Sequence, residues 1–187
     1  MDGKPPSRAE IFAALAQELD IPTICRRFGL TREDLANLLQ EAAALFQKGT
    51  TGTWRLYVDG ASRGNPGPAG AGAVLLDPGG QKKGQVSQYL GETTNNVAEY
   101  QALLHGLELA LSLGVKNLQV LADSLLVVQQ LKGAYQVKTP HLFPLFSQAQ
   151  KTLEKFDAWA ISHLDRSLNK EADRLARQAI DQNQRKR

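Results

Sequence analysis

The spacing of hydrophobic residues along the chain changes near residue 53. Before that point, apolar residues recur three or four positions apart, which is the spacing of one face of an α-helix. The residues on these faces are Ile11, Phe12, Leu15, Leu19, Leu35, Leu38 and Leu39. Gly29 falls between the two stretches, and Thr31 with Asp34 has the spacing of a helix capping box. Residues 1–50 are therefore predicted to form a small all-α module.

From residue 53 onward, runs rich in β-forming residues are interleaved with helical patterns. We expect strands at 54–59, 71–76, 85–90, 117–122 and 158–164, and helices at 96–113, 124–131, 143–156 and 169–180. Turn residues rich in Gly and Pro separate the first three strands, so these strands are expected to be consecutive and antiparallel. The order βββαβααβα predicts an α/β fold with a mixed sheet and helices.

A short polar segment divides the chain. Residues 48–53, KGTTGT, are small and without periodicity, which is typical of a linker. The predicted parts are a helical module at 1–50, a main domain at 53–182 and a basic tail at 183–187. Two interpretations of the module stay open. It is a bundle that docks on the main domain or on another protein, or it resembles a helix-turn-helix nucleic-acid binder with Arg26, Arg27 and Arg32 near phosphates.

Charge and composition narrow the class of protein. The chain has 187 residues and a net charge of +3, which is compatible with a polyanionic partner. The module carries six Lys/Arg and seven Asp/Glu, so the positive charge belongs to the main domain. No apolar run approaches the roughly 20 residues of a membrane span, and the N-terminus does not resemble a signal peptide. Cys25 is the only cysteine. We therefore expect a cytoplasmic protein without a disulfide.

Four carboxylates are the candidates for chemistry. The motifs of dinucleotide, P-loop and HExxH sites are missing from the sequence. Asp59 and Asp123 end two predicted strands, while Glu99 and Asp173 lie in the first turns of two predicted helices. Carboxylates that converge at low exposure repel one another unless cations neutralise them. Oxygen ligands of this kind select Mg²⁺ or Mn²⁺.

Each carboxylate also has a purely structural interpretation. Asp59 is then a turn residue, Asp123 a helix N-cap, and Glu99 and Asp173 partners of helix dipoles. Periodicity alone does not show that the four residues converge. The order of the elements favours convergence if the first and fourth strands are neighbours in the sheet.

Four ordered blocks carry a resemblance to the ribonuclease HI family. They are YVDGASRGNPGPAGAG, TTNNVAEYQALLHGLELAL, LADSLLVVQQL and HLDRSLNKEADRLA, and together they span about residues 53–182. The resemblance implies a five-stranded mixed sheet, three antiparallel strands then two parallel ones, with the first and fourth strands adjacent. It implies that Asp59, Glu99, Asp123 and Asp173 bind two Mg²⁺ ions, with Mn²⁺ as a possible substitute, and that Asp59 bridges them.

The same resemblance implies an activity and further site residues. The family hydrolyses the RNA strand of RNA/DNA hybrids and leaves 5′-phosphate and 3′-hydroxyl ends. His163, ten residues before Asp173, matches the loop histidine that assists proton transfer or product release. The positions that match the family's substrate contacts are Gly60, Asn65, Asn95, Asn96 and Asn169. The expected partner is an RNA/DNA hybrid, bound by a monomer.

The sequence also departs from the family pattern. Residues 132–142 lead directly into the next helix, so the basic extra helix of some bacterial members is missing. DRSL, after His163, replaces the more common glycine-containing loop. Two other functions stay open: a nuclease of the same fold that acts on duplex RNA, and a non-catalytic module that binds nucleic acid.

Overall fold

The computed structural model describes residues 21–39 and 52–184. The chain divides into two compact units, Met1–Lys48 and Gly49–Arg187. The helix predicted at the start of the module, most of the linker and the last three residues of the basic tail lie outside the described residues. Among the residues that are described, no helix is long and apolar enough to cross a membrane.

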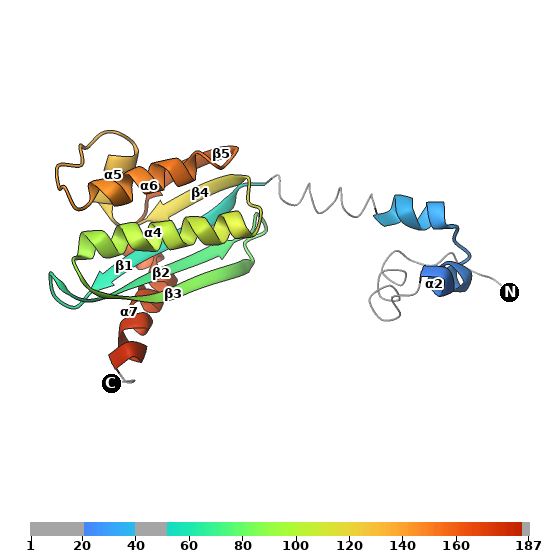
Figure 1. Ribbon diagram of the computed structural model, residues 1–187, viewed down its shortest axis with the longest axis horizontal. Coiled ribbons are helices and arrows are strands. Elements are labelled where there is room, and N and C mark those ends of the chain that lie inside the picture. Colours follow the sequence, from blue (N-terminus) through green and yellow to red (C-terminus); the bar gives the residue numbers. More distant parts are fainter. Residues whose placement is uncertain (1–20, 40–51, 185–187) are drawn as a thin grey trace. The chain divides into compact units, whose positions relative to one another are not determined.

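A single five-stranded sheet forms the centre of the second unit (Figure 1). Its strands are β1 (Trp54–Ser62), β2 (Gly67–Leu76), β3 (Lys82–Thr93), β4 (Asn117–Ala122) and β5 (Ala158–His163). Their order is β3-β2-β1-β4-β5. The first three strands pair antiparallel, whereas β4 pairs parallel with both β1 and β5. The predicted fold class is confirmed, including the adjacency of the first and fourth strands.

Helices cover both faces of the sheet. The helices are α4 (Asn95–Ser112), α5 (Leu125–Leu131), α6 (Phe143–Leu153) and α7 (Lys170–Gln184), and a short 3₁₀ turn, η1 (Arg166–Leu168), precedes α7. In Figure 1, α4, α5 and α6 lie on one face and α7 on the other. Large buried side chains such as Leu56, Leu103, Leu107 and Leu118 fill the core between the sheet and α4. Residues 132–142 pass from α5 to α6 without a helix, as predicted.

Helix α7 lies unusually close to β2. A Cβ atom added at Gly72 would meet the backbone oxygen of Ala172 at 2.1 Å, and one added at Gly70 would meet that of Ala176 at 2.2 Å. Only glycine permits such an approach of a helix to a strand. The glycines of β2 therefore hold the first turns of α7 against the centre of the sheet.

Several element boundaries differ from the prediction. Asp59 was expected to end its strand, but β1 continues to Ser62 and pairs Asp59 with Gly72. Gly60, Ala61 and Ser62 have weak strand propensity, and their ladder with β2 keeps them extended. The other two strands of the antiparallel set are also longer than expected, and the helix predicted at 143–156 ends at Leu153.

The described part of the first unit contains helical residues in two stretches. α2 spans Ile21–Phe28, and a second helix covers residues 32–39. Between them Gly29 has a φ of 65°, a left-handed conformation that glycine adopts without strain. The predicted capping box is confirmed: the Asp34 amide donates to Thr31 Oγ1 at 3.0 Å, and the Thr31 amide donates to Asp34 Oδ2 at 2.8 Å.

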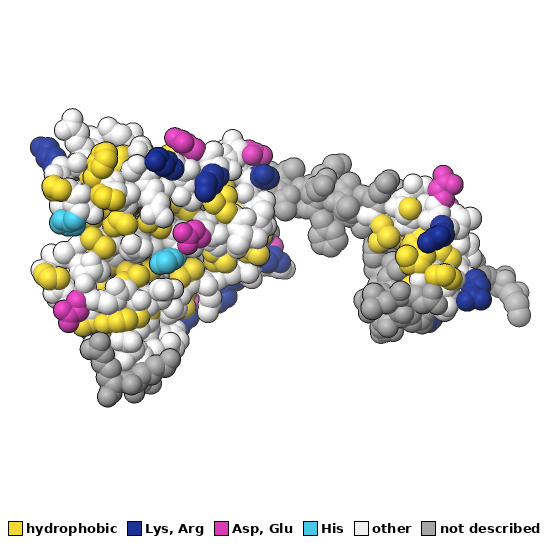
Figure 2. Space-filling model, viewed as in Figure 1, with side chains coloured by type: hydrophobic (Ala, Val, Ile, Leu, Met, Phe, Trp, Pro, Cys, Tyr) yellow, Lys and Arg dark blue, Asp and Glu magenta, His cyan; other side chains and the backbone are white. Residues whose placement is uncertain are grey.

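Charged and hydrophobic side chains are interspersed on the face of the second unit shown in Figure 2. Scattered Lys and Arg, drawn dark blue, and Asp and Glu, drawn magenta, lie there among hydrophobic side chains, drawn yellow. This mixture agrees with the small net charge of the whole chain.

Candidate active site

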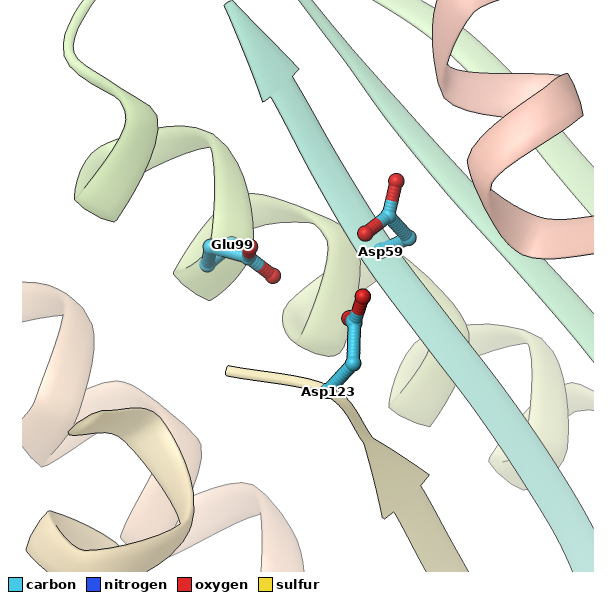
Figure 3. Close-up of side chains that lie close together, drawn as sticks. All are labelled: Asp59, Glu99 and Asp123. Atoms are coloured by element: carbon cyan, nitrogen blue, oxygen red, sulfur yellow. The ribbon is translucent and has the colours of Figure 1, made fainter. Parts of the chain in front are cut away.

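Three carboxylates from separate elements converge at the centre of the sheet (Figure 3). Asp59 comes from β1, Glu99 from the second turn of α4, and Asp123 from the residue after β4. Each offers one oxygen atom, and these three oxygens lie within 4.8 Å of one another. Asp59 is 2% exposed and Glu99 is 7% exposed. We call these three residues the acidic cluster.

The sheet register brings Asp59 and Asp123 together. β1 and β4 run parallel, with Val58 opposite Ala122, so the next residues along the two strands are Asp59 and Asp123. The two aspartates are therefore neighbours at the point where β4 ends and β1 continues. The side chain of Asp59 therefore needs no loop to hold it, because its backbone pairs with Gly72 of β2 and the preceding residue, Val58, pairs with Ala122 of β4.

Gly60 brings Glu99 into the acidic cluster. A Cβ atom at Gly60 would lie 2.2 Å from the Glu99 nitrogen and 2.3 Å from the Ala98 carbonyl carbon, so β1 touches the backbone of α4. The Gly60 amide donates to Glu99 Oε2 at 3.1 Å. Thr94 caps the helix, since the Val97 amide donates to Thr94 Oγ1 at 3.4 Å. Glu99 thus lies next to Asp59 because glycine leaves room for its helix.

The structure excludes two of the purely structural interpretations. Ser124, not Asp123, is the N-cap of α5, and its Oγ accepts from the Val127 amide at 3.5 Å. Asp59 lies within a strand rather than in a turn. Capping and turn chemistry therefore do not explain why aspartates occupy these two positions.

Burial makes the acidic cluster electrostatically unfavourable on its own. Burial, and then the negative charge of Asp123, raises the pKa of Asp59 to about 8. Burial, followed by the charge of Asp59, raises the pKa of Glu99 well above its usual range. Asp59 Oδ2 is buried and has no hydrogen-bond partner within the described ranges. An all-oxygen donor set with an unpartnered buried oxygen fits a hard divalent cation such as Mg²⁺.

Asp173 lies at the margin of the acidic cluster and is not one of its three members. Its Oδ1 accepts from Arg166 Nη2 at 3.1 Å and from Arg177 Nη2 at 3.0 Å, and its Oδ2 lies 2.9 Å from Arg177 Nε. Its negative charge still contributes to the raised pKa of Asp59. Its assignment as a fourth metal ligand stays a prediction.

Asn169 and His163 both contact Asp123. Asn169 is 1% exposed, and its Nδ2 donates to the Val58 carbonyl at 2.8 Å and to Asp123 Oδ1 at 3.1 Å. Exposed His163 ends β5, and its Nε2 lies 3.2 Å from the Asp123 carbonyl oxygen. Asn169 therefore orients a cluster carboxylate, a role that the sequence interpretation did not give it.

A cleft of about 490 Å³ opens above the acidic cluster. Asn95 lines this cleft. Its backbone N–H donates to Asn65 Oδ1 at 3.2 Å, and this hydrogen bond connects the first turn of α4 to the β1–β2 turn. Asn96 is exposed in the same helical turn. The cleft is also lined by Arg63, Arg166 and Arg177, residues that the sequence interpretation missed as site residues. A basic rim around an acidic centre suits a polyanion that binds together with cations.

The raised pKa of Asp59 predicts how stability depends on pH. Between its usual value of 3.8 and about 8, the folded state binds more protons than the unfolded state, so stability falls as pH rises through this window. Cations that bind the carboxylates offset this loss, so Mn²⁺ should raise the melting temperature more at the upper end of the window than at the lower end. In terms of the free energy of unfolding, Mn²⁺ is expected to stabilise the protein by about 1–3 kcal/mol more at the upper end of the window than at the lower end.

Scanning calorimetry at several pH values, with EDTA or with Mn²⁺, tests this expectation. Asp157→Asn is a matched control, because Asp157 is exposed and lies outside the acidic cluster. Stability in EDTA that rises with pH across this window would contradict the electrostatic description of the cluster.

Comparison with known proteins identifies relatives for the second unit. The profile of a family described as reverse transcriptase-like matches residues 57–179. Ribonuclease HI of Halobacterium salinarum is 40% identical over 141 residues, which cover 75% of this chain and 71% of that protein. The crystal structure of RNase H1 from this archaeon superposes with a TM-score of 0.69 at 42% identity, covering 70% of this chain and 99% of that one.

Two further relatives match the same part of the chain. The bifunctional protein Rv2228c of Mycobacterium tuberculosis is 45% identical over 127 residues, which are 67% of this chain but 35% of that protein. The chain thus spans about a third of that relative's length. The crystal structure of LC11-RNase H1 in complex with an RNA/DNA hybrid has a TM-score of 0.67 at 39% identity, covering 70% of this chain and 98% of that one.

Proposed function

This chain belongs to the ribonuclease HI family, and from that premise we propose that it hydrolyses the RNA strand of RNA/DNA hybrids with two divalent cations. The observation that carries the proposal is the acidic cluster: three carboxylate oxygens within 4.8 Å, two of them from buried residues. Mg²⁺ is the proposed cation, because it binds few carboxylates and takes its other ligands from water and substrate phosphates. The proposed products carry 5′-phosphate and 3′-hydroxyl ends.

The cluster residues hold their positions before substrate arrives. Strand pairing fixes Asp59, the Gly60 amide holds Glu99, and Asn169 holds Asp123. Two cations about 4 Å apart would activate a water molecule and stabilise charge on the leaving 3′ oxygen. Rigid strands and helix starts suit this chemistry because small displacements of metal ligands are costly to the rate.

We assign proposed roles to the other predicted site residues, which lie around the acidic cluster. His163 is exposed beside Asp123, a position suited to proton transfer or to product release. Asn65, Asn95 and Asn96 gather at the start of α4, where their amides suit 2′-hydroxyls and base edges of the minor groove. Gly60 and Asn169 stay predicted substrate contacts, although Asn169 is buried.

Four further parts of the proposal began as inferences from the sequence. The cytoplasmic location and the monomeric state stay predictions. For the helical module, docking on a protein and binding to nucleic acid both stay open. Asp173 is proposed as the fourth metal ligand, and its place beside the acidic cluster and its charge effect on Asp59 support this.

A panel of duplexes tests the proposed substrate. The full chain, in Mg²⁺, is given an end-labelled RNA/DNA hybrid, single-stranded RNA, duplex RNA and duplex DNA of one sequence. We expect the RNA strand of the hybrid to be cleaved at least about tenfold faster than any other RNA. The reason is that the proposed site contacts 2′-hydroxyls of one strand and requires a partner strand that lacks them. Asp157→Asn, remote from the cleft, should retain the selectivity.

The other outcomes of the panel have defined meanings. Equal cleavage of duplex RNA would contradict hybrid specificity and favour the duplex RNA nuclease. Binding of the hybrid without cleavage, in the presence of either Mg²⁺ or Mn²⁺, would favour a non-catalytic binding module.

A further inference from the structure

Arg166 makes two ionic contacts at the mouth of the cleft. It lies in η1, the short turn between β5 and α7. Its Nη2 is 3.1 Å from Asp173 Oδ1, and its Nε is 3.9 Å from Asp123 Oδ2. The Asp165 side chain caps this turn by accepting from the Ser167 amide at 2.8 Å, so the backbone that carries Arg166 is held in place. One guanidinium thus spans two of the four carboxylates.

The oxygens of Asp123 and Asp173 that contact Arg166 belong to carboxylates with several further polar contacts. Asp123 Oδ1 already accepts from Asn169 Nδ2, which leaves Oδ2 for Arg166. Asp173 uses one oxygen for Arg166 and both for Arg177. The Asp123 side chain is only 8% exposed, whereas that of Arg166 is 69% exposed. The carboxylate is therefore confined, while the cation has room to move away.

The guanidinium of Arg166 lies beside the acidic cluster. Its Nε is 3.9 Å from Asp123 Oδ2, and Arg166 lines the same cleft as Asp59 and Glu99. Two unit charges about 4 Å apart interact appreciably near a protein surface. Arg166 is thus placed to supply part of the positive charge that a divalent cation would supply.

We propose that Arg166 is a built-in counter-cation that competes with divalent cations for Asp123 and Asp173. This inference rests on the proposed function, because it needs metal to bind at the acidic cluster. Arg166 keeps the carboxylates in position and moves toward solvent as a cation binds, so it weakens metal affinity. It is a positioning residue, and its effect is expected in metal binding without any nucleic acid.

An ordinary surface ion pair would behave differently. Arg174, on the neighbouring helix α7, pairs with Glu171 at 3.1 Å, with both side chains about half exposed and outside the cleft. Such pairs contribute little to stability and have no reason to affect metal affinity. Arg174→Ala removes the same charge eight residues further along the chain, outside the cleft, and is therefore the matched control for Arg166→Ala.

Titration of Mn²⁺ into the full chain, followed by calorimetry and by electron paramagnetic resonance, tests the proposal. Arg166→Ala should tighten Mn²⁺ binding about tenfold, because the competing charge is gone. Arg166→Lys keeps the charge, so its Mn²⁺ affinity should stay within about twofold of that of the wild type. Lysine lacks the planar guanidinium group, so it competes with Mn²⁺ slightly less well than arginine does. Arg174→Ala should bind as the wild type does. In EDTA, Arg166→Ala should melt at a lower temperature than Arg174→Ala.

The outcomes separate this proposal from the proposed function. Asp59→Asn reports on the cluster itself: if it binds Mn²⁺ as the wild type does, the metal site and the proposed function both fail. If Asp59→Asn loses binding but Arg166→Ala binds with unchanged or weaker affinity, only the counter-cation proposal is overturned. Arg166→Gln, which keeps a polar side chain of similar length, replaces the alanine variant if circular dichroism shows that the latter does not fold.

Discussion

Asp59→Asn should lower the rate of hybrid cleavage by at least about 10³-fold and should raise thermal stability in EDTA. Asparagine has the same shape, so the pairing of β1 with β2 and β4 is retained. It removes a carboxylate whose burial and neighbours raise its pKa to about 8. The repulsion that this charge causes is then relieved, with an expected gain of about 1–3 kcal/mol at a pH above that value.

A substitution that lowers the cleavage rate but raises the stability distinguishes a metal ligand from a packing residue. Loss of a packing residue lowers both quantities, since the rate falls with the folded fraction. Single-turnover cleavage and calorimetry on the same preparation measure the two effects. Asp157→Asn, which removes an exposed aspartate outside the cleft, should change neither. An Asp59→Asn variant that cuts at the wild-type rate would contradict the assignment of Asp59.

Gly60→Ala should disrupt the site through the backbone rather than through a ligand. The added methyl group would lie 2.2 Å from the Glu99 nitrogen, so β1 and α4 must move apart. The backbone has no rotamer that relieves this contact, and overpacking of this kind costs about 1–3 kcal/mol or more. The movement also displaces Glu99, whose Oε2 accepts from the Gly60 amide. We expect a lower melting temperature and a cleavage rate reduced by about 10²-fold or more.

Cleavage measured well below the melting temperature separates displacement of Glu99 from unfolding. Gly79→Ala is the matched control, because the nearest atom to its added methyl group is the Asp77 Oδ1 at 3.3 Å, in an exposed turn. It should retain both the stability and the rate. Wild-type cleavage by folded Gly60→Ala would contradict the view that the contact of β1 with α4 positions Glu99.

Residue patterns predicted the main elements, and together with the family resemblance they predicted the fold and the three members of the acidic cluster. The spacing of hydrophobic residues identifies three elements of the site. They alternate with other residues at the start of β1, recur every three or four positions in α4, and form a short run in β4. The neighbouring positions of Asp59 and Asp123 then follow from the pairing of β1 with β4. That pairing came from the family resemblance, because a period reports on one element and not on its neighbour.

Contacts between side chains of different elements were not predictable in this way. Arg166 meets Asp173 and Asp123 because η1 turns it over the cleft, and no periodic pattern marks that turn. Arg63 pairs with Asp181, which is 118 residues away. The strand ends were misplaced for a related reason, since sheet pairing overrides the weak propensity of Gly60 and Ala61.

The most direct test is cleavage of an RNA/DNA hybrid, labelled on both strands, by the wild-type chain in Mg²⁺ and in EDTA. The account predicts that the RNA strand alone is cut, that each new upstream end carries a 3′-hydroxyl and each downstream end a 5′-phosphate, and that EDTA abolishes the reaction. Cleavage that continues in EDTA, or that leaves cyclic or 3′-phosphate ends, would contradict hydrolysis by cations held at Asp59, Glu99 and Asp123.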